Sequence, residues 1–443
     1  MRVVTVALLV SVAVAVPVAA QTAAEQPGQG TGQATGAAVD PSRQSTGQIG
    51  GPAVDDNPMS TQSGLLHEPG ALRRAVTMAN RWLGEGGGAP RDGFYPEFGN
   101  MITGAGWISA GPGYRQHLFG DRAFVDGSTA ISWHAYKMAQ ARFELPALAG
   151  RRLAVGTQVR WQDLTQVNYF GIGPDSQETA QSQYRLKDTD VVGYGTYRVN
   201  GWLSAGGTFG HLQRPTLSSP TGPFQGNWPD ALQTFPHDPG VASQPSFLHG
   251  SASVAADTRD YPGHPTEGGL YRAGFAAYSD RDSGQFSFQR YDVEGLQLVP
   301  VKGDTWILAM HGWAVFSGTA SGDEVPFYML PTLGGQDTLR GYDNYRFHDR
   351  NMLLASAESR WALFSDVDAV AFFDAGGVAA RRGDLNLHKT SWGAGLRVHA
   401  RRTTFARLDV GHSVEGWQVF FRLDDPFALK HLSRRTAEAP FAP

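Results

Sequence analysis

The chain has 443 residues, with 37 Lys and Arg, 41 Asp and Glu, 55 Gly and no Cys. A net charge of −4 argues against nucleic-acid binding, which requires a basic face, and the lack of Cys excludes disulfides, Cys-ligated metal clusters and thiol catalysis. The mean hydropathy is slightly negative, which excludes a bundle of membrane helices but suits a membrane barrel whose strands alternate apolar and polar residues.

The first twenty residues have the pattern of a secretory signal peptide. Arg2 precedes an apolar run from Val3 to Val18, and Val18-Ala19-Ala20 is a small-residue cleavage site. A membrane anchor is the alternative, but the run is shorter than the ~20 residues that a spanning helix needs. Residues 1–20 are therefore predicted to be a signal peptide that directs export.

Two segments precede the part of the chain that has strand periodicity. Residues 21–66 are rich in Gln, Gly, Thr, Ser and Ala, a composition that buries too little apolar surface to fold, so we predict disorder. Residues 67–103 are expected to hold a short helix and a connector. The helix is predicted over 69–84, where apolar residues recur every three or four positions, and the glycine run 84–88 ends it.

From residue 104 to residue 427 the apolar residues alternate with polar ones. In the last segment, for example, Trp417 and Val419 fall on one face and Gln418 on the other. Successive segments of this kind, separated by turn residues, are typical of a transmembrane antiparallel β-barrel, an all-β fold. The predicted strands are 104–118, 123–145, 153–172, 183–198, 201–215, 247–259, 268–280, 286–301, 304–318, 351–364, 367–379, 390–402, 403–413 and 416–427.

These segments predict about 14–16 strands, an even number because both ends of a bacterial barrel lie on the periplasmic side. Two connections are long. Residues 216–246 are rich in Pro, Ser and Gly and are expected to form a mobile extracellular loop, whereas residues 320–350 carry a motif. Residues 428–443 lack periodicity and are expected to be a loose C-terminal extension.

The connection 320–350 contains the first two of four short motifs, and the next two predicted strands contain the others. In chain order they are Gly334-Gly335, Arg340-Gly341-Tyr342, Glu358-x-Arg360 and Phe372-x-Asp374-x-Gly376. This set resembles the bacterial surface antigen superfamily, whose barrels include BamA, TamA and the two-partner secretion transporters. The resemblance implies a 16-stranded barrel in the outer membrane of a Gram-negative bacterium, with the Arg-Gly-Tyr loop folded into the lumen.

The chain departs from that family in having no room for the periplasmic transport-associated domains that usually precede the barrel, and it lacks a patatin-like domain. We therefore expect a short member of the family, whose barrel occupies residues 104–427.

The motif residues make physical sense as a latch. A buried Arg340 is tolerated only when carboxylates neutralise it, and Glu358 and Asp374 lie on successive strands where both can face inward. The fixed fork of guanidinium donors can bind both acids, which a lysine cannot. The predicted latch residues are Arg340, Gly341, Tyr342, Glu358, Arg360, Asp374 and Gly376. Two interpretations stay open, a latch that changes state during transport and a structural staple that does not move.

Motifs for enzyme chemistry are missing from the sequence. There is no G-x-S-x-G or H-E-x-x-H, and the 13 His lack ligand spacing, so we expect no catalytic residues, cofactor or metal. Two alternatives stay open for polar residues at strand ends and on strands. In the first case, either a cation is bound by the acids Asp257, Asp260, Asp280 and Asp282, or these are ordinary polar residues at the barrel rim. In the second case, either an outer-membrane hydrolase site contains His134 and His211, or these histidines have no catalytic role.

The scattered Trp residues, such as Trp107, Trp133, Trp161, Trp202, Trp306 and Trp313, form a ligand cage or, more simply, an interfacial girdle.

The sequence thus favours an outer-membrane barrel that moves or inserts protein or lipid through its lumen or through the seam between its first and last strands. A passive pore or structural barrel is the alternative, and an outer-membrane hydrolase is a minor one. The expected partners are outer-membrane lipid, lipopolysaccharide and a secreted or membrane protein client, with no nucleic acid. The cell's own barrel assembly machinery is expected to insert the chain.

Overall fold

The computed structural model describes residues 92–99, 108–261, 263–400 and 403–423, together with parts of 64–78. All of these residues belong to one compact unit, Asp55–Pro443. The predicted signal peptide (1–20), the predicted disordered segment apart from its last three residues, and the predicted extension 428–443 lie outside the described residues.

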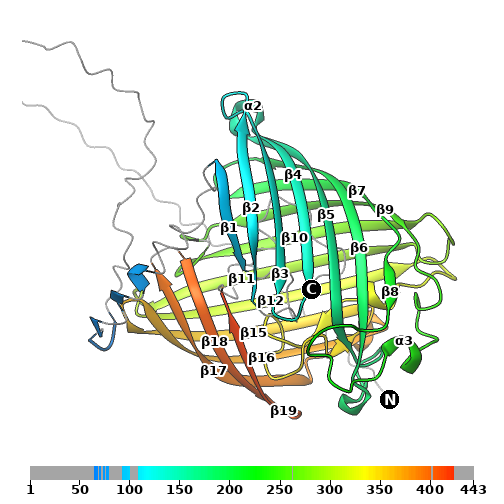
Figure 1. Cartoon of the computed structure of the whole chain (residues 1–443). Helices are drawn as coiled ribbons and strands as arrows, with labels where there is room; N and C mark the ends of the chain where they lie inside the picture. Colours follow the sequence, from blue (N-terminus) through cyan, green and yellow to red (C-terminus); the bar gives the residue numbers. More distant parts are fainter. Residues whose placement is uncertain are drawn as a thin grey trace, which may run out of the picture. The chain divides into compact units, whose positions relative to one another are not determined.

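One 17-stranded antiparallel sheet dominates the described part of the chain (Figure 1). Its members are β1 (Gly93–Gly99), β2 (Ser109–Leu118), β3 (Ala123–Ser132), β4 (Lys137–Ala147), β5 (Leu153–Tyr169), β6 (Ser182–Arg198), β7 (Leu203–Leu212), β8 (Thr216–Ser218), β9 (Phe247–Asp257), β10 (Gly268–Asp280), β11 (Phe288–Lys302), β12 (Trp306–Thr319), β15 (Asn351–Phe364), β16 (Val367–Ala379), β17 (Lys389–Ala400), β18 (Thr403–Ser413) and β19 (Gly416–Arg422). Because β8 is only a three-residue strip beside β6, sixteen strands form the ladder, each paired with the next along the chain.

The sheet curls around an interior, as the ribbon shows (Figure 1). The two ends of the ladder are β1, which pairs with β2, and β19, which pairs with β18. No pairing between β1 and β19 occurs among the described residues, so the ladder has a seam at this point. The predicted all-β barrel of 14–16 strands is confirmed, with sixteen strands and an open seam.

Two strand predictions differ from the structure. The predicted strand 123–145 is two strands, β3 and β4, because the chain turns at residues 133–136, where Ala135 has a φ of +59°. That turn contains neither Gly nor Pro, so nothing in the sequence marked it. Strand β1 lies within the predicted connector, where Pro96 and the neighbouring glycines hide the alternation.

The described residues between 70 and 78 are helical, as the three-to-four-residue periodicity predicts. Val76 of this segment is buried against Phe405 of β18. Among the described residues, no helix has the length and apolarity needed to span a membrane.

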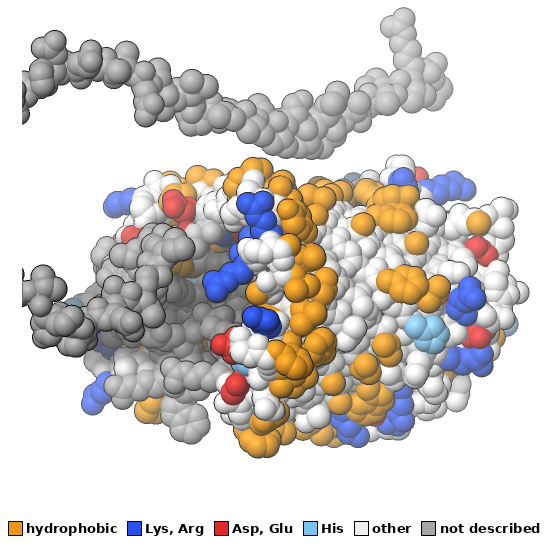
Figure 2. Space-filling model, turned by 90° about the horizontal axis from the view of Figure 1, so that it is seen from above, with side chains coloured by type: hydrophobic (Ala, Val, Ile, Leu, Met, Phe, Trp, Pro, Cys, Tyr) orange, Lys and Arg blue, Asp and Glu red, His pale blue; other side chains and the backbone are white. Residues whose placement is uncertain are grey.

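The strand alternation separates two environments. In β18 and β19 the side chains of Leu408, Trp417 and Val419 are exposed, whereas Arg407 and Arg422 are buried. Because a charge facing lipid at mid-depth costs about 2–4 kcal/mol, the buried charged face must be the lumen and the apolar face the outside. Apolar side chains gather on the outer face of the sheet (Figure 2).

The segment between β12 and β15 fills part of the interior. It contains the short helix η2 (Phe327–Met329) and a small hairpin of β13 (Thr332–Leu333) and β14 (Phe347–His348). Leu333, Leu339 and Tyr342 pack against wall residues in a buried apolar cluster. The segment 320–350 is therefore a loop inserted into the barrel, as the sequence predicts.

The other long connection, predicted to be a mobile loop, has its own packing contacts. It contains helix α3 (Ala231–Thr234), whose first turn is capped by the Asp230 side chain. Ala231 is buried in an apolar cluster that includes Tyr169 of β5 and Phe327 of the inserted loop. The 216–246 segment therefore packs onto the same end of the barrel as the inserted loop.

Candidate functional site

The tip of the inserted loop is shaped by two consecutive glycines. Gly334 and Gly335 have φ angles of +111° and +101°, a region that side chains disfavour. The Gly335 amide donates to the carbonyls of Leu339 and Tyr342, which closes a tight turn. This turn projects Arg340 toward β15 and β16, so the Gly-Gly pair serves to aim the arginine.

Arg340 binds two buried carboxylates on neighbouring strands. Its Nε and Nη2 donate to Asp374 of β16 at 3.0 and 2.8 Å, and its Nη1 donates to Glu358 of β15 at 2.6 Å. The backbone amide of Arg340 also donates to Asp374, at 3.1 Å. The guanidinium lies 3.7 Å above the centre of the Phe372 ring, and Ser356 accepts from Nη2 at 3.2 Å. Arg340 thereby meets both acids named by the motif.

Strand register explains why the acids converge. Ser356 lies directly opposite Asp374, and Glu358 lies opposite Phe372, so the four side chains share the inner face of the β15–β16 pair. The Ser356 hydroxyl donates to Asp374 at 2.5 Å. The Ser356–Asp374 bond fixes the carboxylate in the pocket that receives Arg340.

The network extends along the wall beyond the predicted latch. Glu358 also accepts from Arg360 at 2.9 Å and from Arg397 of β17 at 3.0 Å. Arg397 in turn donates to Asp409 of β18 at 2.6 Å. Arg407 of β18 donates to the Asp337 side chain of the inserted loop and, at 3.1 Å, to the Gln336 carbonyl.

Glu358 and Arg360 belong to the predicted latch, whereas Arg397, Arg407 and Asp409 were missed as members of the site, although alternation places these three on the inner face. An alternating run of buried Arg and Asp on β17 and β18 is the signal that could have revealed them.

Close backbone contact supplements the charges at the loop tip. A Cβ added to Gly341 would lie 2.7 Å from Ser391 Cβ and from the backbone carbon of His412. The Ser413 hydroxyl donates to the Gly341 carbonyl at 2.6 Å. The loop tip therefore lies directly on β17 and β18, and the absence of a side chain at residue 341 permits the approach.

The remaining predicted latch residues take structural positions. Tyr342 is buried with its ring edge-on to Phe347, at 5.3 Å between ring centres. Gly376 lies under the loop, where a Cβ would meet Leu333 at 3.0 Å. Arg360 binds Glu358 on the wall. The predicted set is thus gathered in one region, with Arg340 at its centre.

A second anchor ties the loop to two other connections. Arg346 donates through Nε to Glu415, in the turn between β18 and β19, at 3.0 Å. Its Nη groups donate to Ser176, in the connection between β5 and β6, at 2.9 and 2.7 Å. Gln418 of β19 donates to Asp343 of the loop at 3.0 Å. The last hairpin of the ladder is therefore joined to the inserted loop.

Burial and neighbouring charges shift the pKa values of two residues of the inserted loop. Burial alone would lower the pKa of Arg340, but Asp374 and Glu358 outweigh it, so the pKa of this guanidinium lies above its ordinary value. Burial, together with the charge of Arg346, lowers the pKa of His348 to about 3. The loop is therefore held by a permanent cation and carries a neutral histidine at neutral pH.

The cation site that the sequence suggested as an alternative is wrong. Asp257 and Asp280 lie at opposite ends of the β9–β10 pair, opposite Leu270 and Phe247 respectively. Asp257 binds Arg259 at 2.8 Å, and Asp280 accepts backbone hydrogen bonds from its own turn. Strand direction separates these acids into two groups that cannot share an ion.

The residues considered for a hydrolase site are also apart from one another. His134 lies in the turn between β3 and β4 and not on a strand, and His211 of β7 is exposed. Of the tryptophans, Trp133 and Trp202 are exposed on different hairpins, whereas Trp313 packs inside against the loop cluster. Trp107 lies outside the described residues.

This chain resembles known proteins in both family and fold. A family model described as the Omp85 superfamily domain matches residues 135–411. A search of curated protein sequences gives no significant match. Among solved structures, BamA from Haemophilus ducreyi lacking POTRA domains 1–3 aligns with a TM-score of 0.56 and 14% identity over 75% of this chain and 69% of that chain.

Two further solved structures are CdiB proteins. CdiB from Escherichia coli aligns with a TM-score of 0.48 and 16% identity over 76% of this chain and 63% of its own. For CdiB from Acinetobacter baumannii the values are 0.48, 13%, 74% and 58%. This chain therefore spans less than two thirds of either CdiB chain, and its likeness to BamA shows the fold.

The family model covers more than half of the chain, including the inserted loop and the strands that carry its acids. The chain therefore belongs to the Omp85 superfamily, the outer-membrane β-barrels of protein assembly and translocation, which confirms the resemblance to BamA-type barrels.

Proposed function

We propose that this protein moves or inserts polypeptide at the outer membrane, with the seam between β1 and β19 as the place of release. The observation that carries the proposal is the state of the ladder ends. Each end strand has seven residues, whereas β5 and β6 have seventeen, and neither end strand has a second partner among the described residues. An edge strand with free amides and carbonyls can receive an incoming strand.

The inserted loop favours the hypothesis of a gated barrel rather than that of a passive pore. It fills part of the interior with buried apolar residues, and Arg340 and Arg346 bind it to β15, β16, the β18–β19 turn and the β5–β6 connection. A pore that conducts freely would need an interior without such a plug. In the proposed cycle, the predicted signal peptide directs export, the barrel is inserted, and the loop stays fastened until a client protein arrives.

Cysteine crosslinking tests the seam, because the natural chain has no Cys. Phe94 of β1 and Val419 of β19 are 85% and 58% exposed, so membrane-permeant reagents can reach Cys at both positions from the lipid side. The test pair is Phe94→Cys with Val419→Cys, joined by bismaleimides of increasing length. The matched control is Val410→Cys with Val419→Cys, which ties two strands that already pair and leaves the seam free.

The readout is the set of outer-membrane and secreted proteins in cells where each form replaces the natural one. The proposal expects the seam-locked form to reproduce the loss seen on deleting the gene, while the control pair behaves as the natural protein does. If deletion changes neither protein set, and the purified barrel conducts ions steadily in planar bilayers, the passive pore is correct and the proposal fails.

A further inference from the structure

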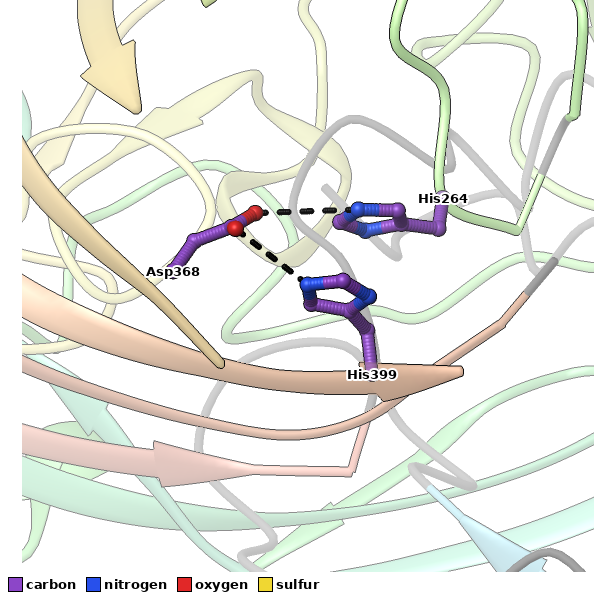
Figure 3. Close-up of side chains that lie close together, drawn as sticks. All are labelled: His264, Asp368 and His399. Atoms are coloured by element: carbon purple, nitrogen blue, oxygen red, sulfur yellow. Dashed lines mark hydrogen bonds and ion pairs between the residues drawn. The ribbon is translucent and has the colours of Figure 1, made fainter. Parts of the chain in front are cut away.

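Three side chains that are distant in the sequence meet at one end of the barrel (Figure 3). His264 lies in the connection 258–267 between β9 and β10, Asp368 lies near the start of β16, and His399 lies near the end of β17. All three are buried. This end of the barrel is the one opposite the inserted loop, since β16 begins at the hairpin turn that follows β15.

The three side chains direct their nitrogen and oxygen atoms at one point. Nε2 of His399 is 3.2 Å from one Asp368 oxygen, and Nε2 of His264 is 3.6 Å from the other. The imidazole rings stack at 3.8 Å between centres and 11° between planes. One ligand atom from each residue lies within 4.8 Å of the other two.

We propose that His264, Asp368 and His399 form a binding site for a divalent transition metal, with Zn²⁺ as the best-matched ion. Two imidazoles and one carboxylate are a donor set that zinc prefers. Ligand atoms at the usual zinc distances in a tetrahedron are about 3.4 Å apart. This spacing is close to the 3.2 and 3.6 Å that separate the two Nε2 atoms from the two oxygens of the Asp368 carboxylate. The fourth position would be taken by water.

A divalent ion is compatible with the stacked arrangement of the two rings when both imidazoles are neutral. Two stacked imidazoles repel one another when both are protonated, whereas neutral imidazoles can each direct Nε2 at a shared cation. Asp368 supplies one negative charge toward the ion, and Arg360 of β15 acts electrostatically on the same carboxylate, which reduces the net attraction. We therefore expect a site of moderate affinity that stays specific for metals which prefer nitrogen ligands.

The surroundings hold the histidines in the required orientation. Nδ1 of His264 is 3.1 Å from the Thr404 hydroxyl, and its Nε2 is the nitrogen that faces Asp368. The Thr404 amide donates to the Gly263 carbonyl at 3.0 Å, and the His399 amide donates to the Asp366 carbonyl at 3.0 Å. The contact of Nδ1 with Thr404 is of the kind that orients metal-bound histidines in known sites, whereas the two backbone hydrogen bonds position the segments that carry the rings.

The site would join parts of the wall that the ladder keeps apart. Strands β11, β12 and β15 lie between β10 and β16 in the sheet. A metal bound to His264 and to the two wall residues would tie the β9–β10 connection to β16 and β17 and brace this end of the barrel. The inference is independent of what the barrel transports.

Metal titration of the purified, folded, full-length barrel tests the site. After chelator treatment, Zn²⁺ binding is measured by calorimetry and Co²⁺ binding by its visible absorption, which distinguishes tetrahedral coordination. The natural protein should bind one ion per chain with a tetrahedral Co²⁺ spectrum. His264→Ala, Asp368→Asn and His399→Ala should each abolish this binding, and Thr404→Val should weaken it about 10- to 100-fold.

A matched control separates the site from general histidine binding. His311 is also buried beside one carboxylate, Glu294 at 2.8 Å, but belongs to no cluster of three such ligands among the described residues, so His311→Ala should bind the ion as the natural protein does. Folding of every variant is checked by its heat-dependent mobility in detergent gels. The proposal is overturned if the natural protein binds no ion, or if folded His264→Ala binds it equally well.

Discussion

Gly411 of β18 lies directly against the backbone of Arg340, so close that a Cβ at residue 411 would sit 1.6 Å from the Arg340 carbonyl oxygen. The arginine is therefore seated by shape as well as by charge. Because residue 411 has no side chain, the loop backbone can approach β18 this closely, and the Arg340 guanidinium reaches Glu358 of β15 and Asp374 of β16.

Gly411→Ala should displace the loop tip without changing any charge. The added methyl group cannot share space with the Arg340 carbonyl, so the tip must shift, and the Arg340 hydrogen bonds should lengthen or break. We expect lower heat stability, measured as the temperature at which the folded gel mobility is lost. Gly318→Ala of β12 is the matched control, because a Cβ there meets nothing within 4 Å. Equal stability of the two variants would contradict the close contact.

Arg340→Ala should be strongly destabilising, because it leaves Asp374 and Glu358 as buried acids with one fewer cation. Removing one partner of a buried ion pair costs about 3–5 kcal/mol. Arg340→Lys should recover only part of the loss, since a single ammonium cannot donate to both acids in the observed fork. The measurement is the midpoint of unfolding in urea or heat.

The exposed ion pair of Arg214 and Asp282 provides the control for Arg340→Ala. Its atoms are 3.2 Å apart, but the Arg214 side chain is 65% exposed, so Arg214→Ala should cost less than about 1 kcal/mol. If Arg340→Ala is as mild as Arg214→Ala, the buried network does not stabilise the barrel.

Asp374→Asn combined with Arg340→Ala should cost less than the sum of the single changes. The two side chains share two hydrogen bonds, so removing either side chain already abolishes both of them, whereas the bond from the Arg340 backbone amide to Asp374 does not depend on the arginine side chain. Contacting residues of this kind show coupling energies of about 0.5–3 kcal/mol. A double-mutant cycle on unfolding midpoints gives the coupling directly, and strict additivity would show that the residues act separately.

Acidification should loosen the inserted loop through His348. Its pKa in the folded state is about 3, below the ordinary histidine value, because the ring is buried near Arg346. Between pH 6.5 and 3 the unfolded or released loop binds a proton that the seated loop does not, so the seated form loses stability as pH falls and changes little below pH 3.

Protease cleavage of the 320–350 loop, followed as a function of pH, measures this effect. Cleavage should rise from pH 7 to pH 4 in the natural protein, and His348→Gln should flatten the rise because glutamine does not titrate. A profile that is identical in both proteins would assign the pH effect to another group.

Most of the ladder could be predicted from the sequence, because lipid and lumen impose opposite demands on alternate residues. Strands such as β18 and β19 carry that alternation clearly. Strand β1 was missed because Pro96 and its neighbouring glycines carry no such pattern. The turn between β3 and β4 was missed because Ala135 adopts a left-handed conformation that the sequence does not announce.

The site was predictable only where its residues are close in the chain or fall within a motif. Arg340, Glu358 and Asp374 lie within one ordered motif set that resembles a known family, and strand alternation then placed the two acids on the inner face. His264 meets Asp368 and His399 only because a connection from β9–β10 reaches distant wall strands. That contact depends on the curvature of the whole sheet, which no local pattern encodes.

The anchor at Arg346 has a mechanical consequence for the seam. Arg346 donates a hydrogen bond to Glu415, and Gln418 donates one to Asp343, so two contacts join the last hairpin to the inserted loop. If β19 moves away from β18, the contacts that join the last hairpin to the inserted loop must break or the loop must move with it, and the same holds when the loop leaves the lumen. Release of the inserted loop and opening of the seam are therefore mechanically coupled.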